Sequence, residues 1–163
     1  MIWTDYGDNP KIERATLAGQ ERTTIIANNG ITRLKYPNDV LVDYTSNKIY
    51  WVDAGLNVVG TADLEGRNIK ISEPIKNSHL FAVALYNNTL YITDSEMNAK
   101  SIIVIDKESL REISRFSSSV IGSLDLFGLT LLHESRQPAG EQEVLLMLYS
   151  FFVLEWFSIE CRK

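Results

Sequence analysis

Tyr50-Trp51-Val52-Asp53 is the stretch of this sequence from which the fold can be worked out. Similar tetrapeptides stand at Ile2-Trp3-Thr4-Asp5 and at Tyr91-Ile92-Thr93-Asp94. The tryptophans at positions 3 and 51 are 48 residues apart, and the tyrosines at positions 50 and 91 are 41 residues apart. A repeat with a period in the forties, built from short strands, is typical of the blades of a β-propeller.

The residues around each tetrapeptide repeat as well. The segment 11–19, KIERATLAG, aligns with the segment 58–66, VVGTADLEG. Within each unit, short apolar or β-branched runs alternate with turn residues such as Thr45-Ser46-Asn47. The sequence therefore predicts an all-β chain, with blades at roughly residues 1–36, 37–78 and 79–120.

Composition narrows the class of protein. The chain has 163 residues, 45% of them hydrophobic and 23% charged, which is typical of a globular domain. Its formal net charge of -5 argues against nucleic-acid binding, because neutralising phosphates needs a basic face. The single cysteine, Cys161, excludes an internal disulfide framework and a cysteine-rich zinc site.

These repeats resemble the YWTD, or class B, repeats of the low-density-lipoprotein-receptor family, which form six-bladed β-propellers. The resemblance covers residues 1 to about 138 and includes the strand Lys11-Ile12-Glu13-Arg14-Ala15 and the pattern Pro37-Asn38-x-x-Leu41-x-x-Asp43. The chain departs from the family at Asp39, where glycine is usual, and at Ile92, where tryptophan is usual. The resemblance implies a partial six-bladed YWTD propeller of about three blades.

The C-terminal part is expected to divide in two. Residues 125–138 resemble the family's last propeller strand, which in full-length relatives closes the ring against the first blade, ahead of an EGF-like module. Residues 139–163 carry no EGF cysteine pattern, so we expect the propeller to cover 1–138 and a divergent tail, outside it, to cover 139–163. The apolar run in the tail predicts a short helix, and Glu155 leaves it too short to span a membrane. No signal peptide is recognisable at the N-terminus.

The motif residues are expected to serve the fold first, because they recur in every unit. The aromatic side chains would fill the space between blades, and the aspartates would accept hydrogen bonds from nearby backbone donors. The alternative is that the aspartates bind a partner or an ion. The residues concerned are Trp3, Asp5, Tyr50, Trp51, Asp53, Tyr91 and Asp94.

Three further sets of residues invite functional hypotheses. Asn87-Asn88-Thr89 satisfies the rule for N-glycosylation at Asn87. His79 and His133 suggest a pH switch, although incidental histidines are the simpler interpretation. An exposed acidic face would, by the resemblance, bind protein ligands, and an ordinary solvated surface is the alternative; its residues are Asp39, Asp43, Asp63, Glu65 and Glu73.

No catalytic motif, cofactor site or metal site is recognisable in the sequence. The resemblance implies a non-catalytic, extracellular or cell-surface propeller that binds protein ligands in a receptor of the lipoprotein-receptor class, of the endocytic or the Wnt co-receptor type. A nidogen-like propeller that binds matrix proteins is the main alternative. A calcium-dependent propeller hydrolase is the third.

Overall fold

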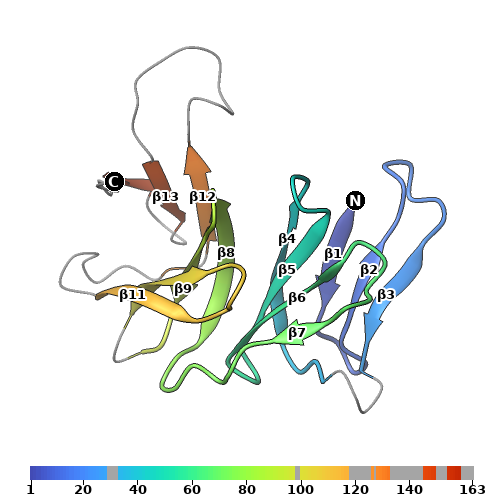
Figure 1. Cartoon of the computed structure of the whole chain (residues 1–163), viewed down its shortest axis with the longest axis horizontal. Coiled ribbons are helices and arrows are strands. Elements are labelled where there is room, and N and C mark those ends of the chain that lie inside the picture. Colours follow the sequence, from blue (N-terminus) through green and yellow to red (C-terminus); the bar gives the residue numbers. More distant parts are fainter. Residues whose placement is uncertain are drawn as a thin grey trace.

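The chain folds into a succession of antiparallel sheets. The computed structural model describes residues 1–28, 33–97, 100–117, 126, 128–132, 145–149 and 154–158. These residues contain fourteen strands and no helix, and the strands form four sheets that follow one another in chain order (Figure 1). The all-β prediction is therefore confirmed.

The first two sheets come from residues 2–71. The first sheet has the order β1 (Ile2–Asp5), β2 (Lys11–Arg14) and β3 (Thr23–Ala27). The second has the order β4 (Pro37–Asp43), β5 (Lys48–Asp53), β6 (Val58–Asp63) and β7 (Lys70–Ile71).

The remaining sheets continue the same up-and-down pattern. The third has the order β8 (Leu80–Tyr86), β9 (Thr89–Asp94), β10 (Ser101–Asp106) and β11 (Glu112–Ser117). The fourth has the order β12 (Gly128–Leu132), β13 (Leu145–Tyr149) and β14 (Leu154–Ser158). The first three sheets lie within the three blades that the repeat predicts.

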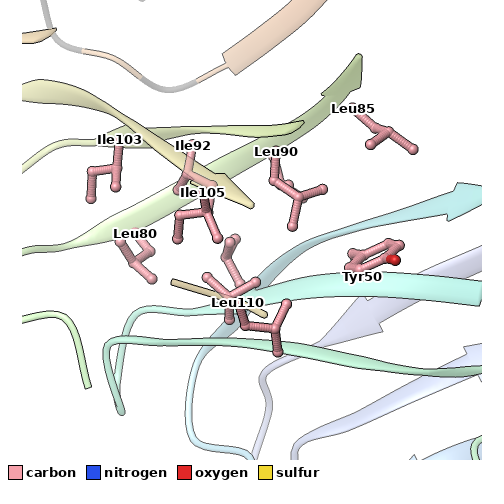
Figure 2. Close-up of a cluster of buried hydrophobic side chains, with 11 residues drawn as sticks. Tyr50, Leu80, Leu85, Leu90, Ile92, Ile103, Ile105 and Leu110 are labelled. Atoms are coloured by element: carbon pink, nitrogen blue, oxygen red, sulfur yellow. The ribbon is translucent and has the colours of Figure 1, made fainter. Parts of the chain in front are cut away.

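Alternating residues of the second sheet face its two neighbours, as the two-residue period of a strand requires. Ile49 and Trp51 pack toward the first sheet, in one buried cluster with Ile12 and Ile26. Tyr50 and Val52, the residues between them, pack toward the third sheet (Figure 2). Side chains of the tetrapeptide therefore fill the space between the second sheet and each of its two neighbours. We call each such interface between neighbouring sheets a seam.

Polar contacts also cross the seam between the second and third sheets. Asn38 Nδ2 donates to the Leu80 carbonyl at 2.9 Å, and the backbone N–H of Val83 donates to Asp39 Oδ2 at 2.9 Å. The contacts join β4 directly to β8, so the two sheets are held by hydrogen bonds between side chains and backbone as well as by apolar packing.

The helix expected in the tail is not found in the two segments of the tail that the structure describes. Residues 145–149 and 154–158 are strands, and β13 pairs with β12 in the register Gly128↔Tyr149 to Leu132↔Leu145. A short apolar run has no period that separates a strand from a buried helix, and the edge of β12 offers it a partner for its backbone groups. β12 resembles the strand that closes the ring against the first blade in full-length relatives, and here it pairs with the tail. The domain boundary at residue 138 stays a prediction, and this pairing crosses it.

Candidate functional site

Asp53, the last residue of the central tetrapeptide, organises two loops at one end of the second sheet. Its fully buried carboxylate accepts backbone N–H groups from Lys35 at 2.7 Å and Tyr36 at 3.1 Å, in the connection before β4. It also accepts those of Gly55 at 2.8 Å and Leu56 at 3.0 Å, in the turn after β5. One carboxylate therefore fixes the two loops to each other.

Gly55 lies where these loops meet. A Cβ atom at Gly55 would lie 2.7 Å from side-chain atoms of both Lys35 and Tyr36. A side chain at position 55 would therefore force the Lys35 and Tyr36 side chains to move. Lys35 Nζ lies 5.5 Å from the centre of the Tyr36 ring, within the range of a cation–π interaction.

Asp94 has the corresponding role in the third sheet. Its buried carboxylate accepts the backbone N–H of His79 at 2.8 Å and of Glu96 at 3.1 Å. The Ser101 hydroxyl and an Arg115 guanidinium nitrogen also donate to it, each at 3.1 Å. Asp94 thus joins the connection before β8 to the turn after β9, as Asp53 joins the equivalent segments one blade earlier.

Asp5 is the least engaged of the three motif aspartates. It is half-buried and accepts one backbone N–H, from Gly7 at 2.9 Å. Lys11 Nζ lies 3.8 Å from its carboxylate. Trp3 is also half-buried, with the Arg22 guanidinium 5.4 Å from the centre of its ring.

The remaining motif aromatics are buried between sheets. Tyr50 and Trp51 are fully buried, and Tyr91 lies in the cluster that packs against Leu126. A Cβ atom at Gly60 would lie 2.2 Å from the Trp51 ring, so the indole lies directly on the backbone of β6. These positions suit the structural role that the repeat predicts for the aromatics, which stays a prediction.

The loops held by the motif aspartates lie at one end of the sheets. Thr4, near the end of β1, donates through its hydroxyl to the Asn38 carbonyl at 3.4 Å, and Asn38 in turn donates to Leu80 at the start of β8. The end of β1 and the starts of β4 and β8 are therefore neighbours. We call this end the loop face, and define it by residues 6–10, 33–36, 54–57, 77–79 and 95–97.

The loop face exposes large apolar side chains. Tyr6 is 64% exposed, Tyr36 47% and Met97 87%. Each lies in a loop that a motif aspartate holds: Tyr6 follows Asp5, Tyr36 donates its N–H to Asp53, and Met97 lies three residues after Asp94. Aromatic residues and methionine are enriched in protein interfaces, and Tyr and Trp often carry much of the binding energy. Sequence reasoning missed these three residues, because they have no common spacing from the motif aspartates.

The acidic face predicted from the sequence does not form as expected. Asp43 is buried and pairs with Lys107 Nζ at 2.9 Å, and Asp39 is half-buried against Val83. Each of the two carboxylates accepts a hydrogen bond from the third sheet or its turn, so both lie at the seam between the second and third sheets and not on an acidic surface. Glu65 and Glu73 are exposed, and Glu65 lies near the Arg14 and Arg67 guanidiniums.

Burial and hydrogen bonding act in opposite directions on these two carboxyl groups. At Asp43, burial raises the pKa, but hydrogen bonds from Lys107, Ser46 and the Thr45 backbone outweigh it and lower the pKa from 3.8 to about 2. At Asp39, burial raises the pKa more than the backbone N–H groups of Val83 and Val40 lower it. Asp43 is therefore ionised at neutral pH and forms an ion pair with Lys107.

The histidines, the cysteine and the glycosylation candidate complete the residues singled out from the sequence. His79 is exposed and contacts Asp94 through its backbone, and His133 and Cys161 lie outside the described residues. Asn87 is exposed in the turn between β8 and β9, so its glycosylation stays a prediction. Within the described part of the chain, no three His, Cys, Asp or Glu side chains gather as a metal site would require. That part also contains no helix with the length and apolarity of a membrane span.

The sequence of this chain is similar to a family model and to a curated protein. Residues 1–44 match the model of the low-density lipoprotein receptor repeat class B. The vitellogenin receptor Yl of Drosophila melanogaster is 34% identical over 140 residues, which are 85% of this chain and 6% of that protein. The chain thus spans a small part of the length of the curated relative that it matches.

A solved structure shares the fold. A chain in the crystal structure of a nidogen/laminin complex superposes with a TM-score of 0.67 and 31% sequence identity. The match covers 78% of this chain and 45% of the other. The resemblance drawn from the tetrapeptides, and the partial propeller that it implies, are confirmed by these findings together.

Proposed function

Because this chain carries class B repeats of the low-density lipoprotein receptor type, we propose that it binds protein ligands through its loop face, as a non-catalytic part of a cell-surface receptor. The observation that carries the proposal is the exposure of Tyr6, Tyr36 and Met97 on loops that buried or half-buried motif aspartates hold. Because these loops are fixed before any ligand arrives, binding costs little conformational entropy.

Within this class we propose the endocytic type, since the matched relative is by name a vitellogenin receptor. The proposal includes an extracellular location and N-glycosylation at Asn87. A Wnt co-receptor role is the alternative within the receptor class. A matrix-binding role is the second candidate, favoured by the likeness to a chain solved in a nidogen/laminin complex.

Surface plasmon resonance on the full 163-residue chain tests the proposal, with purified vitellogenin and purified laminin as the two probes. We expect vitellogenin to bind, and Tyr36→Ser and Met97→Ser each to weaken binding by about tenfold, the loss of one interface anchor. Tyr44→Ser is the matched control, because Tyr44 is 83% exposed in the turn at the opposite end of the second sheet.

The outcomes separate the candidates. Binding of laminin without vitellogenin would replace the endocytic proposal by the matrix-binding one. Binding that falls equally with Tyr36→Ser and Tyr44→Ser, or no binding of either probe, would overturn the assignment of the loop face.

A further inference from the structure

A groove, which we call the rim groove, lies beside the outermost strands of the second and third sheets, and none of Tyr6, Tyr36 and Met97 lines it. It runs between the end of β7 with the connection that follows and the turn that leads into β11, and its volume is about 610 Å³. Ile75 and Leu110 form its apolar part, and both also pack against the core of the seam between the second and third sheets. A volume of this size suits a few side chains of a bound segment.

The strands on either side of this rim groove are the last strands of their sheets. β7 pairs with β6 and β11 pairs with β10, and among the described residues neither has a partner on its other edge. Ile71 on β7 is 44% exposed, and Ile113 on β11 is 60% exposed. An edge strand with exposed apolar residues presents unpaired backbone groups that can accept another strand.

The unpaired charge of the rim groove is positive. Glu112 is bound on both oxygens by the Arg115 guanidinium, at 3.0 Å each. In the described part of the chain, Lys76 and Arg111 have no ion pair, and Glu73 is the one remaining carboxylate of the lining. Two free cations thus face one free carboxylate, in a chain whose formal net charge is -5.

The turn that carries Arg111 is fixed in advance. The Asp106 carboxylate accepts the backbone N–H and the hydroxyl of Ser109, at 2.8 and 2.7 Å. The Arg111 carbonyl accepts the Asp106 N–H at 3.0 Å, and the Asp106 carbonyl accepts the Leu110 N–H at 2.9 Å. Leu110 has a positive φ of 57°, a conformation that a leucine keeps only where its surroundings impose it.

From these observations we propose that the rim groove binds an extended acidic segment of a partner protein. The segment adds as a strand to the free edge of β11 and places an apolar side chain against Ile75 and Leu110. Acidic residues on either side of that side chain pair with Lys76 and Arg111. This site is separate from the loop face, so one propeller section would bind two protein segments at once.

Fluorescence anisotropy on the full chain tests the proposal with a labelled peptide of alternating leucine and glutamate. We expect the double variant Lys76→Glu and Arg111→Glu to weaken binding of this peptide at least tenfold. A counterpart peptide with lysine in place of glutamate should bind at least tenfold more weakly than the acidic one. Lys70→Glu is the matched control, because this exposed lysine neighbours Ile71 on β7 and does not line the groove. It should leave the affinity within twofold.

Several results would overturn the proposal. The first is equal affinity of the chain for the acidic and the basic peptide. The second is a loss of affinity for the acidic peptide with Lys70→Glu as large as that with the double variant. The third is unchanged affinity of the double variant for the acidic peptide. Sedimentation velocity tests whether a second copy of the chain occupies the groove instead. If the chain binds no peptide, and forms a dimer that dissociates in the double variant, a second copy fills the groove and the proposal is overturned. Tyr36→Ser should keep full peptide affinity, which separates this site from the loop face. Circular dichroism checks that each variant keeps its strands.

Discussion

Replacing Asp53 by alanine removes the acceptor of four backbone N–H groups at once. A hydrogen bond to a charged acceptor contributes about 1.5–3 kcal/mol net. Lys35 and Tyr36 lie in an exposed loop, so water replaces part of what their N–H groups lose. We therefore expect Asp53→Ala to lower the free energy of unfolding by about 3–5 kcal/mol, less than four full bonds.

Asp5→Ala is the matched control, since Asp5 occupies the same position of the repeat. It accepts one backbone N–H, from the exposed Gly7, and its contact with Lys11 is a half-exposed ion pair. We expect a loss of about 0.5–1 kcal/mol. Asp53→Asn keeps one acceptor oxygen but turns an amide donor toward other donors, so a loss of about 2 kcal/mol is expected. This variant gives a measurable value if the alanine variant does not fold.

Urea denaturation followed by circular dichroism and by tryptophan fluorescence measures all three variants. The slope of free energy against urea should stay constant, since the surface exposed on unfolding does not change. If Asp53→Ala costs no more than Asp5→Ala, the number of backbone donors does not decide the role of the motif aspartate. The loops would then be held by packing alone.

Three further predictions concern other parts of the chain. The folded pKa of Asp43, about 2, lies below its unfolded value of 3.8, so the stabilisation from its pair with Lys107 is present above about pH 5 and lost as the pH falls toward 2. Urea melts across this range should lose about 2 kcal/mol, and Lys107→Met should flatten the loss. Gly60→Ala should destabilise by about 2–3 kcal/mol in the same assay because its Cβ would overlap Trp51, and a change below about 0.5 kcal/mol would contradict that contact. If Asn87 is glycosylated, the chain secreted from eukaryotic cells should lose mass when a glycosidase removes the glycan, and Asn87→Gln should abolish this loss. A wild-type chain whose mass does not change would refute the site.

The sequence predicts best what is repeated. The strand Lys48–Asp53 and its counterpart Thr89–Asp94 lie at the expected residues because aromatic and β-branched positions alternate and turn residues bound them. The burial of Trp51 also follows from the repeat. The strands of the tail were not predicted, because the tail has no repeat to compare with and its apolar run has no clear period.

Side-chain partners were harder to predict than strands. Asp43 is four residues from Asp39 in the sequence, and both were expected on the surface. One donor to each carboxylate lies in the next blade: Lys107 is 64 residues from Asp43, and Val83 is 44 residues from Asp39. No local pattern reports a contact of that range. The exposure of Tyr36 and Met97 likewise depends on how neighbouring blades leave the loop ends uncovered.

The seams between the sheets differ, although the sheets themselves repeat. The first seam holds the Trp51 indole, which lies on the backbone of Gly60, among aliphatic side chains. The second holds Tyr50 among aliphatic side chains, together with the buried pair of Asp43 and Lys107. A blade cut out and reinserted elsewhere in such a chain would meet a neighbour of the wrong shape or charge. Gene duplication can therefore multiply these blades, but each copy becomes committed to its place in the order once its seam has diverged.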